Sequence, residues 1–439
     1  MNKAEKEADD ILKKAKARAD TLKISQDLDI ISTRNGVKIM PTFNNAVIYL
    51  QQDERLKGIF RYNEFAHIIE IARHPPWGTL GDVGKRIHDY DALHLKKFLI
   101  KEYKVEMPKS ILSDAIDHAA TLNSYDPVKN YLNNLVWDKT PRLETWLTSY
   151  LGADDNDYTR HVGKLTLAAA CARVMQPGIK YDYMLILEGA QGIGKTRTAA
   201  ILGGEWYREI SLTERTKDTV EKMQGAWIIE VAELAVFKKR DIESLKAFIT
   251  NQQDVERLSY DRRAMIFPRR NIFIGTINPD NHGYLSDTSG NRRFLPVSCG
   301  NKIDMGALQR DRDQLWAEAL QLYKNGFKLW IDDPKVEEIA LEQQQERESQ
   351  DAWQDKIEKY LENLERTTGL EIWTECMQGF ASEFDRGKQM RIADCLRRLK
   401  WDRKTIYVDG KHVKGYFAPE KWKHKSPWND GEEWKDAEG

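Results

Sequence analysis

The spacing of apolar residues changes along the chain and divides it into segments with different expected structures. Residues 1–35 carry one narrow apolar stripe on a Lys- and Glu-rich background, which predicts a charged helical arm, either frayed in solvent or packed on a neighbouring subunit. In residues 36–150 apolar residues recur every three or four positions, which predicts a helical domain. The domain shows no catalytic pattern, so we expect it to act as a collar for oligomerisation or to contact DNA.

Residues 151–330 alternate short apolar runs with helical segments, which is typical of a parallel β-sheet covered by helices. The runs predict strands over residues 183–187, 206–212, 226–230 and 271–278. Helices are predicted over residues 159–175 and 242–250, and the first of them could cover a nucleotide base or simply pack on the sheet. Alternating polarity on both sides of residues 260–263 predicts a β-hairpin with an aromatic and basic tip.

The first predicted strand runs into a stretch that fits G-x-x-x-x-G-K-[ST]: Gly189, Ala190, Gln191, Gly192, Ile193, Gly194, Lys195 and Thr196. Glycines let successive backbone N–H groups point at a polyphosphate, and the helix that opens with Arg197 directs its positive end the same way. Lys195 would reach the β- and γ-phosphates, and the Thr196 hydroxyl would bind Mg²⁺. A chance match is the alternative, but a strand before and a helix after are the context that the motif requires. The stretch therefore predicts a nucleoside triphosphate site.

Later strands end in polar residues that could complete this site. Glu230 ends an apolar run and is assigned to the metal, whereas Glu233 is assigned to water activation or to a shared role. Asn278 ends the next run and could orient the attacking water or sense the γ-phosphate, because parallel strands bring such ends together. Arg292 and Arg293 follow a flexible turn, and either could stabilise charge on the transferred phosphoryl group or pair with a surface acid.

The C-terminal part is more basic than the rest of the chain. Residues 331–365 are polar and predict a helical connector, and residues 366–425 show helical spacing followed by a strong hairpin signal around Asp409-Gly410. Between residues 386 and 425 there are 13 Lys and Arg against 4 Asp and Glu, which indicates either a polyanionic partner or a solvated charged face. Helices followed by a basic hairpin are typical of a winged helix that binds DNA. Residues 426–439 form an acidic tail.

Seven side chains are candidates for DNA binding. They lie on the two predicted hairpins or on the helix before the second hairpin: Arg257, Tyr260, Arg262, Arg263, Arg397, Arg398 and Lys411.

Composition excludes several other classes of protein. The chain of 439 residues has a net charge of −1 and is long enough for two to four domains of ~100–200 residues. It has no apolar run near the ~18 residues that cross a bilayer and no secretory leader, so no membrane partner is expected. The four cysteines and nine histidines are scattered, which argues against a disulfide framework or a zinc site and favours an intracellular protein with reduced thiols.

The order of these parts resembles the virulence-associated protein E family of phages, prophages and mobile islands, which is similar to superfamily 3 helicases. The stretches that carry the resemblance are YDPVKNYLNNLVWDKTPRLETWL, LILEGAQGIGKT, AWIIEVAEL, the hairpin before NIFIGTIN, and TSGNRRFLPV. They cover residues 40–300 and, more loosely, continue to residue 418. The separated acids Glu230 and Glu233 depart from the adjacent acidic pair of many superfamily 3 enzymes.

The resemblance implies an α/β, AAA+-like P-loop core with an N-terminal helical domain and a C-terminal winged-helix-like module. It implies an ATP-dependent DNA helicase or replication initiator of a phage or mobile element, cytoplasmic in a bacterial host and assembled as a hexameric ring. ATP and Mg²⁺ would sit between subunits, with Arg292 or Arg293 supplied by the next subunit. The hairpin near residues 260–263 would line a channel and move single-stranded DNA 3′→5′. Origin DNA and host replication proteins are further candidate partners.

Two other functions stay open from the sequence. The first is an ATP-switched assembly that marks an origin or loads a helicase without unwinding DNA itself. The second is a DNA-binding interaction protein whose nucleotide is structural.

Overall fold

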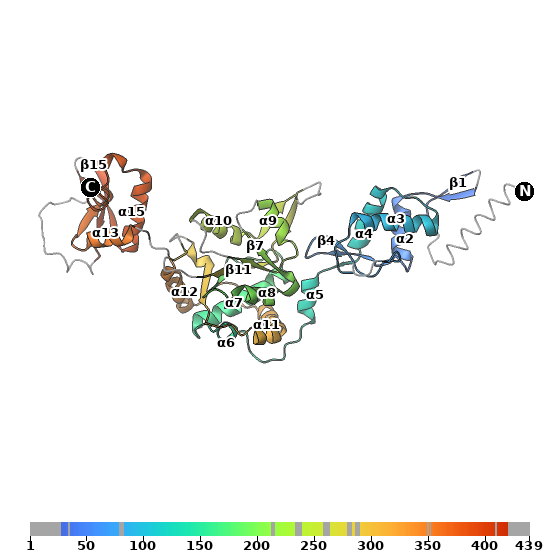
Figure 1. The fold of residues 1–439 in the computed structure, drawn as a ribbon, viewed down its shortest axis with the longest axis horizontal. Helices are drawn as coiled ribbons and strands as arrows, with labels where there is room; N and C mark the ends of the chain where they lie inside the picture. Colours follow the sequence, from blue (N-terminus) through green and yellow to red (C-terminus); the bar gives the residue numbers. More distant parts are fainter. Residues whose placement is uncertain are drawn as a thin grey trace, which may run out of the picture. The chain divides into compact units, whose positions relative to one another are not determined.

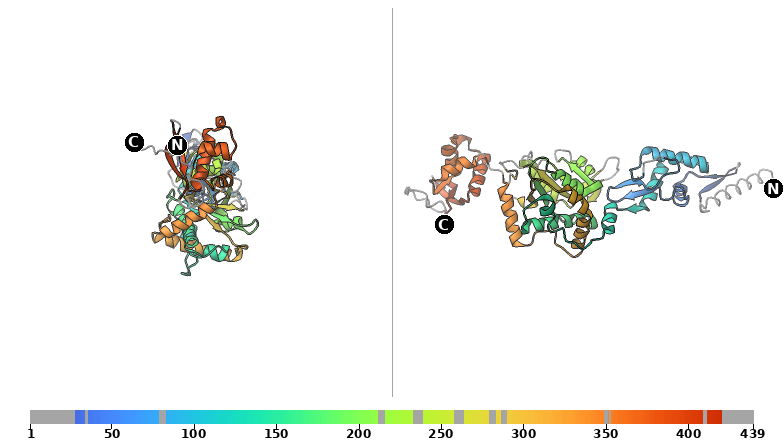
Figure 2. Two further views of the ribbon diagram at one scale, coloured as in Figure 1. Left: turned by 90° about the vertical axis from the view of Figure 1, so that its left-hand side faces the viewer. Right: turned by 60° about the horizontal axis from the view of Figure 1, so that its bottom comes forward.

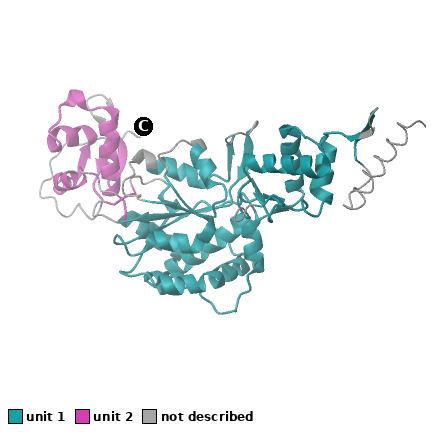
Figure 3. Ribbon diagram, turned by 45° about the vertical axis from the view of Figure 1, so that its right-hand side comes forward, with its two compact units in different colours: residues 1–280, 287–346 teal, residues 281–286, 347–439 magenta. Residues whose placement is uncertain are grey.

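A computed structural model describes most of the chain. The described residues are 28–33, 36–78, 83–211, 216–232, 239–257, 264–278, 283–285, 290–348, 351, 353–408 and 411–419. They belong to two compact units, residues 1–280 with 287–346, and residues 281–286 with 347–439 (Figure 3). No helix in the described ranges is both long and apolar enough to span a bilayer.

The first unit begins with a region of mixed α and β structure. Its strands form a hairpin, β1 (Ile30–Thr33) with β2 (Gly36–Ile39), and a three-stranded sheet in the order β4 (Ile68–Ile71), β3 (Phe60–Asn63), β5 (Ser124–Tyr125). Its helices are α2 (Phe43–Gln52), α3 (Asp89–Tyr103) and α4 (Lys109–Thr121). A shared core packs these helices on β3 and β4 and contains Tyr49, Leu56, Phe60, Leu95 and Ile116.

The prediction of a helical domain in this region was therefore wrong in part. The strands have two to four residues, which is too few for alternation to stand out from the surrounding helical spacing. Their sheet also depends on a distant pairing, because β3 meets β5 in parallel with Tyr62 opposite Ser124. No local pattern could indicate that contact.

A five-stranded parallel sheet forms the centre of the first unit. Its order is β12 (Phe294–Ser298), β6 (Met184–Glu188), β11 (Ile272–Ile277), β8 (Ile228–Val231), β7 (Tyr207–Ile210). Every residue of β6, β8 and β11 is buried, which explains why these strands are almost continuously apolar. The strand predictions are confirmed here, with ends shifted by one or two residues.

Helices cover both faces of this sheet. In Figures 1 and 2, α6 (Trp146–Leu151), α7 (Asp157–Met175), α8 (Lys195–Gly203) and α11 (Met305–Lys324) lie on one side, and α9 (Thr216–Met223) and α10 (Lys239–Thr250) lie on the other. The unit also contains α5 (Pro127–Asn134), α12 (Pro334–Glu346) and the short 3₁₀ turns η1 (Gly204–Trp206) and η3 (Asn291–Arg293). An antiparallel hairpin of β9 (Gln253–Glu256) and β10 (Met265–Pro268) matches the predicted hairpin, whose tip lies outside the described residues.

Helix α7 is a core helix, as the packing alternative predicts. Most of its residues are fully buried, from Tyr158 near its start to Val174 near its end, so it packs all round. Trp227 anchors it to the sheet by donating its indole N–H to Ala170 O at 2.9 Å, and the same ring lies 4.1 Å from the Trp316 ring of α11.

Replacing Trp227 by alanine should lower the free energy of unfolding by about 3–5 kcal/mol, because it leaves a cavity and removes the donor to Ala170 O. Chemical denaturation of the full chain measures this loss. Phe380→Ala is the matched control, since that ring is 74% exposed. Equal unfolding midpoints for the two variants would contradict the central packing role of Trp227.

The second unit combines short helices with a three-stranded antiparallel sheet. The helices are α13 (Gln354–Leu361), α14 (Gly369–Glu371) with the turns η4 (Ile372–Cys376) and η5 (Ala381–Glu383), and α15 (Arg386–Arg398). The sheet order is β13 (Arg366–Thr368), β15 (Lys411–Phe417), β14 (Asp402–Val408). Ile357, Ile372, Ile392 and Leu396 share its core. Strands β14 and β15 pair as the hairpin that the alternation around Asp409-Gly410 predicts.

Candidate functional site

The glycine-rich loop joins β6 to α8 at the carboxyl edge of the central sheet. Gly192 (φ 83°) and Gly194 (φ 113°) adopt left-handed conformations that disfavour side chains. A Cβ at position 194 would also lie 2.0 Å from Met305 Cε, so the Met305 side chain at the start of α11 would have to move. Two backbone bonds fix the base of the loop, from Gly189 N to Ile277 O (3.3 Å) and from Cys299 N to Glu188 O (2.8 Å).

The Lys195 ammonium lies inside this loop. Its Nζ donates to Gly189 O (2.7 Å), Ala190 O (2.8 Å) and Asn278 Oδ1 (2.8 Å), and the side chain is buried. Burial lowers the pKa of Lys195, and electrostatic interactions with Cys299 and Glu230 oppose that shift. The bond to Asn278 connects the loop with the end of β11, as the parallel arrangement of the strands predicts.

Glu230 is the acidic centre of the site and is fully buried on β8. Its Oε1 accepts hydrogen bonds from the hydroxyls of Thr196 (2.7 Å) and Thr276 (2.7 Å), and its Oε2 accepts one from the Tyr207 hydroxyl. Burial, followed by the bond to Glu230, raises the pKa of the Tyr207 phenol, so this group stays a donor at neutral pH. Three hydroxyls therefore hold the carboxylate beside the start of α8.

The sequence analysis missed Tyr207 and Thr276. Glu230 pairs with Glu209 of β7 and with Ile274 of β11. Tyr207 and Thr276 each lie two positions along the strand from these partners, so their side chains are on the same face of the sheet as Glu230. A threonine inside the apolar run of β11 was a signal that could have been noticed. Tyr207 had no comparable signal, because its role depends on which strand neighbours β8.

The donor set fits a magnesium ion. Thr196 and Glu230 offer hard oxygen atoms side by side, which is the chemistry that Mg²⁺ prefers, with nucleotide and water oxygens completing its shell. Within the described ranges no cluster of three or more His, Cys, Asp or Glu side chains forms an independent metal site. A cation would therefore bind here together with its nucleotide.

The remaining loop residues are more open. Ala190, Gln191 and Arg197 are exposed, and Ile193 packs partly against the core. Glu188 accepts a hydrogen bond from Ser298 Oγ at 3.0 Å, which joins the end of β6 to the end of β12.

Arg292 and Arg293 lie at the amino-terminal ends of the strands, opposite the carboxyl ends where the glycine-rich loop is. They precede β12, whose first residue Phe294 pairs with Met184, the first residue of β6, whereas the loop leaves β6 after Glu188. Four residue steps of extended strand correspond to roughly 13 Å, so the two arginines cannot reach the loop of their own chain. Arg292 is exposed, and Arg293 Nη1 donates to Gly290 O at 3.3 Å.

The other candidate residues are more scattered. Arg257 is exposed after β9, and Arg397 and Arg398 occupy the last turn of α15, where Arg397 pairs with Asp394 at 3.0 Å. The candidates outside the described residues are Glu233, Tyr260, Arg262, Arg263 and the side chain of Lys411.

A family comparison accounts for the central part of the chain. Residues 132–349 match the model of the virulence-associated protein E-like domain. This part of the chain is a virulence-associated protein E-like domain. This virulence-associated protein E-like domain contains the glycine-rich loop, Glu230, Asn278 and both arginines, whereas the N-terminal mixed region and nearly all of the second unit lie outside the match.

The solved structures that match the chain are more remote. Two apo structures of the NrS-1 C-terminal region are 13% and 14% identical, each covering 82% of this chain and 96% of its own, with TM-scores of 0.40. An inhibitor-bound JCV helicase is 12% identical over 54% of this chain and 73% of its own, with a TM-score of 0.26. No curated protein matches the chain.

Proposed function

We propose that this chain is an ATP-dependent DNA helicase or replication initiator of a phage or mobile element. The observation that supports the proposal is the convergence of four side chains from three strand ends on one glycine-rich loop: Lys195, Thr196, Glu230 and Asn278. Such a constellation suits phosphoryl transfer, in which catalysis consists almost entirely of positioning and charge stabilisation.

Each residue has a defined task in this proposal. The loop amides and the Lys195 ammonium bind the β- and γ-phosphates, and Thr196 and Glu230 would hold Mg²⁺, which neutralises developing negative charge when it is bound. Tyr207 and Thr276 keep the Glu230 carboxylate oriented. Glu233 is proposed to polarise the attacking water, as expected from its position three residues after Glu230.

Asn278 is well placed to report the γ-phosphate. The Lys195 ammonium has three hydrogens and already donates to three protein acceptors, so a bond to phosphate must replace at least one of them. Loss of the bond to Asn278 would free its amide to orient water. Nucleotide occupancy would then be transmitted to β11.

The arginines support an assembly of several copies. Because Arg292 and Arg293 lie at the end of the strands remote from their own loop, a nucleotide held in a glycine-rich loop could contact them only if that loop belongs to a neighbouring copy. Arginines supplied in this way accelerate hydrolysis about 10³–10⁵-fold. We propose a ring, a hexamer as the family resemblance implies, in which the hairpin of β9 and β10 contacts single-stranded DNA.

Strand displacement on a forked DNA substrate tests the proposal directly. We expect displacement that requires hydrolysable ATP and is abolished by Lys195→Ala. ATP-dependent DNA binding without displacement would favour the origin-marking or helicase-loading alternative. Absence of any hydrolysis by the unaltered chain would favour a structural nucleotide.

The second unit is proposed to bind duplex DNA through α15 and the hairpin of β14 and β15. Replacing Arg397 and Arg398 together by alanine should flatten the dependence of log Kobs on log salt by about 0.9 for each phosphate that the variant no longer neutralises. Fluorescence anisotropy with a labelled duplex measures this slope. Lys359→Ala, an exposed cation on α13, is the control. An unchanged slope in the double variant would remove α15 from the DNA interface.

A further inference from the structure

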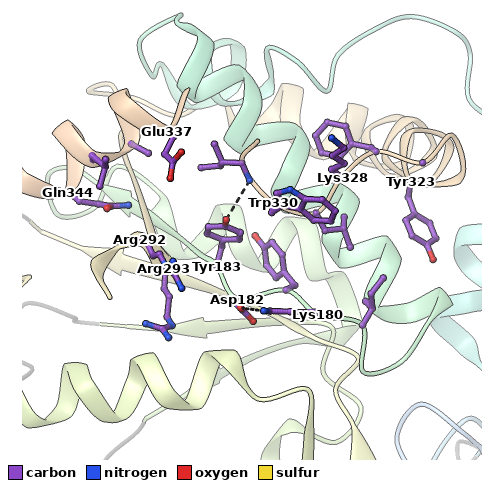
Figure 4. Close-up of a pocket in the computed structure, with 18 residues that line it drawn as sticks. Lys180, Asp182, Tyr183, Arg292, Arg293, Tyr323, Lys328, Trp330, Glu337 and Gln344 are labelled. Atoms are coloured by element: carbon purple, nitrogen blue, oxygen red, sulfur yellow. Dashed lines mark hydrogen bonds and ion pairs between the residues drawn. The ribbon is translucent and has the colours of Figure 1, made fainter. Parts of the chain in front are cut away.

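A cavity of about 610 Å³ opens in the first unit at the edge of the sheet remote from the glycine-rich loop (Figure 4). Its wall is built from residues 179–183, which lead into β6, from the two arginines before β12, from the end of α11 and the segment after it (residues 323–331), and from α12. The size is within the range of about 300–1,000 Å³ that is common for small-molecule sites. The proposed function uses Arg292 and Arg293 against the nucleotide of a neighbouring copy, but it assigns no ligand to the cavity itself and no role to its aromatic wall.

One part of the wall is aromatic. Tyr183, Tyr323 and Trp330 all line the cavity, and 53% of the Trp330 surface is exposed. Tyr183 is held in place, because its hydroxyl accepts a hydrogen bond from Ile331 N at 3.5 Å. A large indole that stays open beside a cavity offers a flat apolar face to a planar ligand.

Another part of the wall carries two guanidinium groups that form no ion pair with a described acidic group, and the Glu337 carboxylate also lines the cavity. Lys180 pairs with Asp182 at 3.3 Å, and Lys328 also has an acidic partner, at 2.7 Å. In contrast, neither Arg292 nor Arg293 has an ion-pair partner among the described residues, and the buried Arg293 Nε has no hydrogen-bond acceptor there. Guanidinium groups match phosphate oxygens in both charge and geometry.

We propose that this cavity binds a nucleotide, with its base stacked on Trp330 and its phosphates at Arg292 and Arg293. A planar ring and an anion in one small molecule satisfy the aromatic wall and the two guanidinium groups together. The nucleotide has two possible sources, free solution or the glycine-rich loop of a second copy. The second source rests on the proposed function, whereas the first does not.

Binding of fluorescently labelled ADP to the full chain tests the cavity. Trp330→Ala should weaken binding at the affected site about 5- to 150-fold, because a base stacked on an aromatic side chain contributes on the order of 1–3 kcal/mol. Trp330→Phe should retain most of the affinity, and Phe380→Ala, which removes an exposed ring in the second unit, should change nothing. Equal affinity of Trp330→Ala and the unaltered chain would overturn the proposal.

The phosphate side of the site has its own readout. Arg292→Gln should reduce the ratio of the affinity for ADP to the affinity for adenosine, whereas Trp330→Ala should lower both affinities by the same factor. An unchanged preference in both Arg292→Gln and Arg293→Gln would contradict the phosphate assignment.

Lys195→Ala distinguishes the two sources. If the nucleotide comes from solution, Lys195→Ala chains keep a site that depends on Trp330. If one nucleotide is shared between the loop of one copy and the cavity of another, Lys195→Ala and Trp330→Ala chains each bind ADP weakly. Mixing the two chains then restores tight binding wherever an intact loop faces an intact cavity. Should the unaltered chain hydrolyse no ATP, the proposed function fails, but the dependence of ADP binding on Trp330 still decides the cavity.

Discussion

Replacing Lys195 by alanine should reduce ATP hydrolysis by at least about 10²–10³-fold, the usual cost of removing one preorganised donor from a phosphoryl or acyl transfer site. The ammonium is buried in the loop, and no other described cation contacts Gly189 O, Ala190 O and Asn278 together. Steady-state phosphate release, with and without single-stranded DNA, measures the effect.

A lysine outside the site provides the control for this experiment. Lys129 is exposed on α5, and its replacement by alanine should leave turnover unchanged. Thermal melting should show that the Lys195→Ala chain still folds, because the loop keeps its glycines and its two backbone anchors. Hydrolysis that survives in a folded Lys195→Ala chain would show that the loop is not the catalytic site.

Glu230→Gln should cause the second large loss, about 10²–10³-fold in hydrolysis, with a higher Mg²⁺ concentration needed for half-maximal rate. The substitution keeps the shape but removes the charge that would hold the cation. It also places an amide NH₂ against hydroxyls that now donate to a carboxylate, and leaving buried donors unsatisfied costs about 1–3 kcal/mol. A Mg²⁺ titration of phosphate release separates the charge effect from the loss of stability.

The matched control is Glu243→Gln, which removes an exposed carboxylate on α10. It should leave both the rate and the Mg²⁺ dependence unchanged. Unaltered Mg²⁺ dependence in a folded Glu230→Gln chain would exclude Glu230 from the metal shell. Glu233, which follows closely in the sequence, would then be the next residue to test.

Part of the candidate site could be predicted because its chemistry is contiguous in the chain. The glycines, Lys195 and Thr196 follow one another directly after an apolar run, so a short stretch contains both the loop and the strand and helix that position it. Asn278 could be predicted as well, since a polar residue that ends a buried parallel strand lies at the sheet edge where ligands bind. The distance between the Asn278 side chain and the loop could not be predicted from the sequence.

The amino-acid sequence by itself determined the phosphate-binding loop, the buried strands and the basic hairpin module, because each depends on residues within about twenty positions of one another. Only the tertiary structure decided the rest. Strand order places Tyr207 and Thr276 beside Glu230. The parallel pairing of β12 with β6 places Arg292 at the end of the strands opposite the loop. A pairing across some sixty residues gives the N-terminal region its mixed α and β structure. Those outcomes depend on which distant segments bury their apolar faces against each other, and the local spacing of residues does not show which segments will pair.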